Sequence, residues 1–260
     1  MTLNALQMRE VFHLVFLRAV VRTVPLSAFS LKGGTNLRFF FRSIRYSEDM
    51  DIDVAGLAVH ILQESVMKAL ESSGLVDTLR TFGIEDLRLP DLARAKQTET
   101  VQRFKIGLLT SAGQDLATKI EFSRRGFDQG IRSEAISSEV LAAYRLPPII
   151  VPHYVARSAA RQKIRALFSR AQPQARDIFD LYLLSSQPDV LGADLAGGFA
   201  PQEIREGRER ICSLDYEIYR DAVVSFLGPL DRATYDSTQA WDEIRLRVVA
   251  MLEGNEHDDK

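Results

Sequence analysis

The chain has almost no cysteine. Cys212 is the only one in 260 residues, which excludes an intrachain disulfide framework and favours a reducing, cytoplasmic setting. The four histidines are scattered and show no zinc-ligand spacing with that single cysteine. The sequence also has no internal repeat and no low-complexity tract. These absences argue against a disulfide scaffold and against a zinc protein.

Long apolar runs are missing as well. The most apolar N-terminal stretch, residues 11–21, is interrupted by His13 and Arg18. Glu10 precedes it, where a signal peptide would carry basic residues. No segment is long enough to span a bilayer. We therefore expect a soluble cytoplasmic protein with no membrane partner.

An excess of positive charge is also absent. The formal net charge is −2, so bulk charge does not indicate nucleic-acid binding, and any RNA contact must come from a local basic patch. Arg157, Arg161, Arg165 and Arg170 recur about every four residues, which predicts such a patch near one helix face. The hydrophobic content of 46% allows one large core or two smaller ones.

The most informative stretch is residues 31–54, LKGGTNLRFFFRSIRYSEDMDIDV. A short apolar run leads into the pair Gly33 and Gly34, and a helix-like segment follows through about Phe41. Glycines let backbone N–H groups approach a phosphate closely, and a following helix offers its positive N-terminal end. This part of the stretch predicts a phosphate-binding turn.

The same stretch ends in strict alternation over residues 47–54, which predicts a half-buried strand. A period of two places Asp49, Asp51 and Asp53 on one face. Three carboxylates on one strand face repel one another, so we expect a divalent cation there, Mg²⁺ or Mn²⁺. The simpler alternative is a glycine turn before an acidic edge strand.

The order of these elements resembles the polymerase-beta-like nucleotidyltransferases, although the spacer from Thr35 to Glu48 is slightly long for their general pattern. The wording L-K-G-G-T-x-L followed by R-Y-S-E-D-x-D is more specifically similar to the AbiEii/AbiGii-type nucleotidyltransferase toxins of type IV toxin–antitoxin and abortive-infection systems. The resemblance covers residues 28–186 and is specific in two motif blocks.

The second block is Lys163 followed by Arg176-Asp177-Ile178-Phe179-Asp180-Leu181-Tyr182. By spacing alone it predicts an exposed ion-pair helix, with Asp177 and Asp180 on one face and Arg176 four residues before Asp180. The resemblance instead implies that Lys163 contacts a nucleotide phosphate and that Asp177 belongs to the active site, supported by Asp180 and Arg176. The choice of Lys163 over its arginine neighbours on the same helix stays open.

The resemblance also implies the remaining site residues. Asp49, Asp51, Lys163 and Asp177 would be catalytic, and Asp49 and Asp51 would hold the metal. The resemblance to polymerase-beta-like enzymes also implies a third metal carboxylate on a later strand. Glu121, in the alternating residues 119–123, is the best placed candidate, with an exposed glutamate as the equal alternative. The expected nucleotide contacts are Lys32, Gly33, Gly34, Thr35, Ser47 and Lys163.

The expected fold is α/β (α+β). A polymerase-beta-like core with a small mixed sheet, residues 1–148, should be followed by a helical C-terminal domain, residues 149–260, closing a cleft. Helices are expected at 4–22, at His60–Ser73 with Gly74 as C-cap, and at roughly 154–169, 174–185, 202–226 and 237–253. Strands are expected between 84 and 123. The proline-rich stretch 146–152 is the expected domain boundary, as a linker or edge strand, and disorder is expected at 254–260.

The function implied by the resemblance is transfer of NMP from an NTP to an RNA acceptor, with a tRNA 3′ end as the expected target. The outcome would be growth arrest or abortive infection in phage defence, with a cognate antitoxin encoded nearby. Two alternatives stay open. One is transfer to a protein side chain or to the enzyme itself, for example at Ser47, and the other is an inactive nucleotide-binding regulatory module.

Overall fold

The computed structural model describes residues 3–253, so the expectation for 254–260 lies outside the described part. The chain divides into two compact units. The first comprises the residues up to Phe40 together with Tyr46–Tyr154, and the second comprises Phe41–Arg45 with the residues from Val155 onward. No helix in the described range is both long and apolar enough to cross a membrane.

The first unit is built on a seven-stranded sheet with the order β3-β4-β5-β2-β1-β7-β6. The pairs β2–β5 and β1–β7 are parallel and the other neighbours are antiparallel, which confirms the expected mixed sheet. The strands are β1 (Phe29–Lys32), β2 (Asp49–Val54), β3 (Ile84–Arg88), β4 (Val101–Thr110), β5 (Asp115–Ser123), β6 (Ile131–Ala135) and β7 (Ile150–Tyr154).

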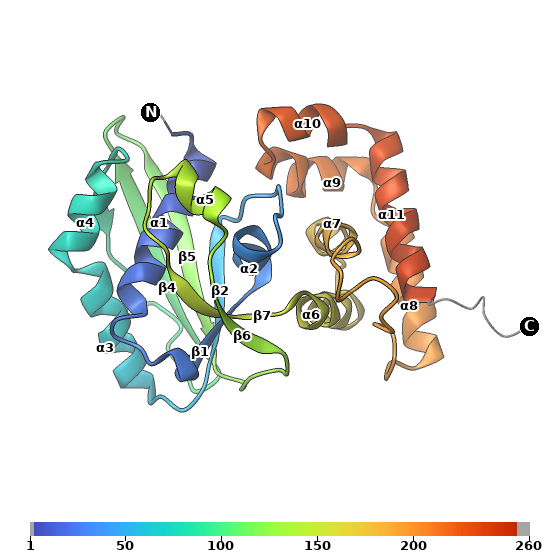
Figure 1. Ribbon diagram of the computed structural model, residues 1–260, viewed down its shortest axis with the longest axis horizontal. Coiled ribbons are helices and arrows are strands. Elements are labelled where there is room, and N and C mark those ends of the chain that lie inside the picture. Colours follow the sequence, from blue (N-terminus) through green and yellow to red (C-terminus); the bar gives the residue numbers. More distant parts are fainter. Residues whose placement is uncertain (1–2, 254–260) are drawn as a thin grey trace, which may run out of the picture. The chain divides into compact units, whose positions relative to one another are not determined.

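Helices cover both faces of this sheet. Figure 1 shows α1, α3 and α4 on one side and α2 on the other. The helices of this unit are α1 (Ala5–Val20), α2 (Gly33–Phe40), α3 (Val59–Leu70), α4 (Ser73–Arg80) and α5 (Ser138–Ala143), with a short 3₁₀ turn η1 (Leu26–Ala28). The face of β2 turned away from the acids enters the core, since Met50 and Ile52 are fully buried there.

Local sequence explains where these elements begin. Asn4 caps α1, because its side chain accepts from the Gln7 N–H at 3.0 Å while the Gln7 side chain accepts from the Asn4 N–H. The apolar partners of the alternating acids give β2 one core face, which fixes its register. The opening helix and the acidic strand are thus confirmed.

Every helix or strand that the structure describes in the second unit is a helix. Its elements are α6 (Ala156–Ser169), α7 (Ala175–Leu184), α8 (Pro201–Cys212), α9 (Tyr216–Ala222), η2 (Val224–Phe226), α10 (Pro229–Tyr235) and α11 (Thr238–Glu253). The only tryptophan, Trp241, is buried in its core, stacked on Tyr219 at 4.4 Å between ring centroids. The Trp241 indole donates to the Leu214 carbonyl at 3.0 Å, so its polar atom is satisfied.

Two expected helices are wrong in their bounds. The helix expected at His60–Ser73 ends at Leu70, and Gly74 lies in the first turn of α4 instead of serving as a C-cap. The helix expected at 202–226 is split into α8 and α9. Asp215 begins α9, because its carboxylate accepts from the Ile218 N–H at 2.9 Å.

The proline-rich stretch also differs from the expectation. Residues 150–154 form β7, which lies between β1 and β6 and is therefore neither a linker nor an edge strand. Pro152 is tolerated because β7 meets β1 at a single register pair, Leu31 with His153. The strand β6, on the outer edge of the sheet, was not expected.

Candidate active site

The acids of β2 lie on one face of the sheet, as the alternation predicts. Parallel pairing with β5 places Glu121 directly beside Asp51 and Lys119 directly beside Asp49. Ile120 and Phe122 of β5 are fully buried on the opposite side. We call the surface formed by Asp49, Asp51, Asp53 and Glu121 the acid face.

Gly33 lies against the centre of the acid face. Its φ is +68°, a conformation that side-chain-bearing residues rarely adopt. A Cβ on Gly33 would stand 2.8 Å from Asp51 Oδ2, well inside van der Waals contact. Gly34 is the second residue of α2 and does not have a positive φ. The positive φ and the close approach therefore both belong to Gly33.

Asp53 has a different environment from the other two acids of its strand. It is 5% exposed, and its carboxylate accepts from Lys32 Nζ at 2.5 Å and from the Tyr154 hydroxyl at 2.8 Å. Burial, together with the hydrogen bond to Asp53, raises the pKa of Tyr154 well above its usual value. Asp53 thus holds Lys32, a predicted nucleotide contact, at the rim of the glycine turn.

Thr35 and Ser47, the other predicted nucleotide contacts of this unit, are turned toward the backbone. The Thr35 hydroxyl is buried and donates to the Lys32 carbonyl at 3.4 Å. The Ser47 hydroxyl donates to the Asp49 carbonyl at 2.8 Å. Both side chains therefore shape the segments that present Gly33 and Asp49.

A buried hydrogen-bond relay from His13 through Thr118 holds the backbone of Glu48, the residue before Asp49. The Thr118 hydroxyl donates to the Glu48 carbonyl at 2.6 Å, which leaves its oxygen to accept from His13 Nε2 at 3.0 Å. Burial, aided by the charge of Arg9, lowers the pKa of His13 to about 3, so the ring is neutral at pH 7. This chain of contacts ties α1 and β5 to the start of β2.

The acid face also carries cations. Lys119 Nζ is 3.1 Å from Asp49 Oδ2 and 3.8 Å from Glu121 Oε2. Arg103 on β4 donates through Nε to Glu121 Oε2 at 2.6 Å. The repulsion expected between the carboxylates is therefore offset by side chains of the neighbouring strands.

The donor set fits a magnesium ion that is shared with a substrate. Between residues 3 and 253, no three Asp, Glu, His or Cys side chains are grouped closely enough to hold a metal by themselves. Mg²⁺, however, is commonly bound by one or two carboxylates together with substrate phosphates and water. Asp51, against Gly33, and Asp49, two residues before it on the same strand face, would supply two hard oxygen donors. Glu121 binds Arg103 and lies near Lys119, which also binds Asp49.

The second motif block forms an ion-pair cluster inside the helical unit. Lys163 Nζ on α6 lies 2.8 Å from Asp177 Oδ1 and 2.6 Å from Asp180 Oδ2, both on α7. Arg170 donates to the other oxygen of Asp177. Both aspartates are almost completely buried, so the simple exposed ion-pair helix is wrong.

Arg45 completes this cluster. Its guanidinium binds Asp180 in a two-pronged arrangement, with Nε 3.1 Å from Oδ1 and an Nη 2.9 Å from Oδ2. Burial alone would raise the pKa of Asp180, but the charges of Arg45 and Lys163 lower it, so the carboxylate stays ionised. Burial likewise opposes the charge on Lys163, yet Asp177 and Asp180 raise the pKa of its ammonium.

The remaining arginines singled out in the sequence have different environments. Arg176 is exposed, and the Asp180 carboxylate is taken by Lys163 and Arg45 instead. The basic patch expected on α6 is only partly present. Arg161 donates to the Gly197 carbonyl at 2.8 Å and Arg170 binds Asp177, whereas the side chains of Arg157 and Arg165 are exposed.

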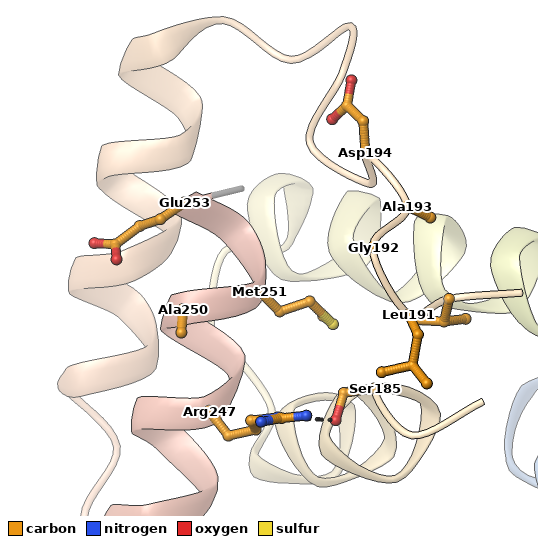
Figure 2. Close-up of a pocket in the computed structure, with 10 residues that line it drawn as sticks. Ser185, Leu191, Gly192, Ala193, Asp194, Arg247, Ala250, Met251 and Glu253 are labelled. Carbon is orange, nitrogen blue, oxygen red and sulfur yellow. Dashed lines mark hydrogen bonds between the residues drawn. The ribbon is translucent and has the colours of Figure 1, made fainter. Parts of the chain in front are cut away.

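A pocket of about 530 Å³ in the helical unit lies away from these residues. Figure 2 shows it between the loop of residues 190–194 and α11, where Arg247 approaches the Ser185 hydroxyl at 3.5 Å. Neither Lys163 nor Asp177 lines it. Its lining mixes polar and apolar side chains, and its two carboxylates, Asp194 and Glu253, come from separate segments and not from one strand face, so we place the candidate site elsewhere.

Sequence reasoning missed several members of the site. Arg45 stands inside the quoted R-Y-S-E-D-x-D block but received no role, and its place in the motif was the available signal. Lys119 and Arg103 were visible only as alternating charged residues on predicted strands. Their pairing with Asp49 and Glu121 depends on the order of strands in the sheet, which local patterns do not reveal.

Solved structures show the same fold over nearly the whole chain. JHP933 from Helicobacter pylori matches with 18% identity and a TM-score of 0.55, covering 97% of this chain and 92% of that one. MenT4, a nucleotidyltransferase toxin from Mycobacterium tuberculosis, matches with 16% identity and a TM-score of 0.63, covering 98% and 85%. No curated protein gives a significant sequence match.

A family model gives the more specific result. The model of the AbiEii nucleotidyl transferase toxin, of type IV toxin–antitoxin systems, matches residues 15–253. The match includes both motif blocks, from the glycine turn of β1–α2 to the ion-pair cluster of α6 and α7. The expected resemblance is thereby confirmed, and the chain belongs to the AbiEii family of nucleotidyltransferase toxins.

Proposed function

We propose that this toxin transfers a nucleoside monophosphate from an NTP to an RNA acceptor, with a tRNA 3′ end as the expected target, in a reaction that depends on Mg²⁺ or Mn²⁺. The apposition of Gly33 and Asp51 carries the proposal. The glycine that opens the phosphate-binding turn lies so close to the central carboxylate that a Cβ would stand 2.8 Å from Oδ2. Phosphates bound at this turn would therefore meet the acid face directly.

The reaction needs charge neutralisation more than covalent chemistry. The acceptor hydroxyl oxygen bonds to the α-phosphorus, the bond from that phosphorus to the bridging oxygen breaks, pyrophosphate leaves, and the hydroxyl proton is released. Asp49 and Asp51 would hold a divalent ion, which would supply charge stabilisation at the phosphates. Backbone N–H groups of Gly33 and Gly34, at the positive end of α2, bind the triphosphate, and Lys32 adds a cation at the rim.

We further propose that Lys163 and Asp177 take part in the same reaction. Lys163 provides a cation of raised pKa for the triphosphate, and Asp177 holds it in place. The two cations that bind Asp177 favour this positioning role over acceptance of the acceptor's proton. Arg45, which binds the same cluster, precedes Asp49 by only four residues in the sequence.

The biological outcome follows from the family. A type IV toxin implies a cognate antitoxin as partner and an NTP as substrate. We propose that the toxin acts in the cytoplasm and that modification of the acceptor arrests growth, as abortive infection in phage defence requires. Whether the antitoxin contacts the toxin directly is a separate question that a pull-down of the two proteins answers.

The test is incubation of the protein with each α-³²P-labelled NTP, total tRNA and Mg²⁺, followed by separation of RNA from protein. We expect label on RNA with one or a few of the four NTPs and none after chelation of the metal. Label on the protein alone would support the alternative of protein or self-modification, with Ser47 as the residue to map. Absence of label from every reaction would support an inactive nucleotide-binding module.

Asp51→Asn and Asp53→Asn make a matched pair for this assay. Each removes one charge from the same strand face, but only Asp51 lies against the glycine turn. Asp51→Asn should abolish transfer with the fold intact, and Asp49→Ala should do the same. Asp53→Asn should lose transfer only mildly while lowering stability, because it breaks a buried pair with Lys32 and Tyr154. Full transfer by Asp51→Asn would contradict the metal assignment.

A further inference from the structure

Lys119 places a positive charge between two of the three predicted metal ligands. Its Nζ lies 3.1 Å from Asp49 Oδ2 on β2 and 3.8 Å from Glu121 Oε2 on its own strand. Parallel pairing puts Lys119 beside Asp49 and puts Glu121 beside Asp51, so the position follows from the sheet register. One ammonium therefore bridges carboxylates that a divalent ion would otherwise draw together.

This ion-pair contact is partly exposed to solvent. The Lys119 side chain is 30% exposed, and those of Asp49 and Glu121 are 40% and 24% exposed. A metal ion that binds Asp49 Oδ2 displaces the ammonium, and one that binds Oδ1 places a second positive charge beside it. Displacement replaces the Lys119–Asp49 ion pair with a metal–Asp49 contact, and the Lys119 ammonium then lacks that carboxylate.

We propose that Lys119 is an internal counter-ion that occupies Asp49 in the nucleotide-free protein and transfers to the triphosphate when metal and NTP bind together. The inference rests on the proposed function, since it takes Asp49 as a metal ligand. Metal alone displaces the ammonium, or binds beside its charge, without compensation, whereas a metal–triphosphate complex brings phosphate oxygens that accept it. Lys119 thus makes metal binding depend on the nucleotide.

Lys105 provides a matched control. It is the direct neighbour of Lys119 in the antiparallel β4–β5 ladder and projects from the same face of the sheet. It is exposed, and no carboxylate of the described chain lies within ion-pair distance of it. Removal of Lys105 changes the local charge as much as removal of Lys119 does, but it leaves the contact with Asp49 in place.

The experiment is a titration with Mn²⁺, with the free ion followed by electron paramagnetic resonance, on the wild type, Lys119→Met and Lys105→Met. Without nucleotide, Lys119→Met should bind Mn²⁺ at least about fivefold more tightly than the wild type, the size of a partly exposed ion pair. Lys105→Met should stay within about twofold. A non-hydrolysable NTP analogue should tighten Mn²⁺ binding more in the wild type than in Lys119→Met.

Each other result has a defined meaning. Equal tightening in both variants overturns the inference, because general charge then explains the effect. Unchanged Mn²⁺ binding in Lys119→Met, with binding lost in Asp49→Asn, overturns the inference and leaves the proposed metal site standing. A lack of Asp49-dependent Mn²⁺ binding in every protein, with or without nucleotide, defeats the proposed function itself. Melting curves check the fold, and Lys119→Gln replaces Lys119→Met if that variant does not fold.

Discussion

Gly33 and Gly34 are adjacent in the sequence but perform different tasks. Gly33 has the positive φ and the close approach to Asp51, and Gly34 begins the regular turn of α2. At the scale of single residues, the positive φ and the close approach to Asp51 therefore belong to Gly33 and not to Gly34.

We predict that Gly33→Ala lowers the free energy of unfolding by roughly 1–3 kcal/mol, because alanine is strained at positive φ and its Cβ displaces Asp51. Gly34→Ala should leave the melting temperature nearly unchanged and weaken NTP binding. Calorimetric melting and NTP titration of both variants measure the two effects. Unchanged NTP affinity in Gly34→Ala would mean that this glycine does not belong to a phosphate cradle.

The acids of β2 show what sequence alternation can predict about individual residues and what it cannot. Alternation correctly placed Asp49, Asp51 and Asp53 on one face, because one side of the strand had to enter the core. It could not separate their roles. Asp53 is held by Tyr154, a residue about a hundred positions later, and that contact exists only because β7 joins the sheet beside β1.

At the scale of elements, the relay from α1 through β5 to β2 depends on a neutral histidine. The pKa of His13 falls from 6.5 to about 3 through burial and the charge of Arg9. As pH falls below 6.5, the unfolded chain takes up the proton first, so the unfolded state is favoured. The stability contributed by neutral His13 is complete above pH 6.5 and is lost progressively toward pH 3.

We predict that this loss is roughly 1 kcal/mol per pH unit between pH 6 and pH 4. His13→Gln should flatten that part of the curve of unfolding free energy against pH. His60, which is exposed, gives the matched control, and His60→Gln should leave the slope unchanged. Urea unfolding across the range provides the measurement, and parallel curves for wild type and His13→Gln would refute the relay's role.

Most elements could be located from local patterns, and the errors have local causes. The break between α8 and α9 was missed because apolar spacing continues through it, while the capping carboxylate of Asp215 interrupts the helix. Gly74 was taken as a stop signal although it lies within α4. The pairing of β2 with β5 joins strands more than sixty residues apart, so the contact of Lys119 with Asp49 lay beyond any local pattern.

At the scale of the whole molecule, Lys163 in the helical unit has two possible roles, one in the transfer reaction and one in the stability of the fold. Its side chain is 13% exposed and is paired with two buried carboxylates. Without Lys163, the carboxylate of Asp180 keeps its contact with Arg45 and that of Asp177 keeps its contact with Arg170. Lys163→Ala should therefore lower stability, by as much as about 3 kcal/mol, and is not the fold-neutral change that an exposed lysine would give.

We predict that Lys163→Ala, assayed well below its melting temperature, loses transfer on the order of a hundredfold or more. Asp177→Asn should lose transfer to a similar extent. Asp180→Asn is the control, because it weakens the same cluster but leaves Lys163 bound to Asp177. If transfer falls in proportion to stability in all three variants, the cluster is structural and the two-block mechanism is wrong.

The short segment Phe41–Arg45 belongs to the helical unit although residues of the sheet unit flank it on both sides in the sequence. Arg45 binds Asp180 and forms a β-bridge with Leu227, and the Phe41 carbonyl accepts from Gln187. A gene fragment that begins after Tyr154 would thus lack Arg45, one of the two cations that bind the buried Asp180. Recombination between related toxin genes cannot exchange the helical unit with one crossover, and functional chimaeras should require that pentapeptide to travel with it.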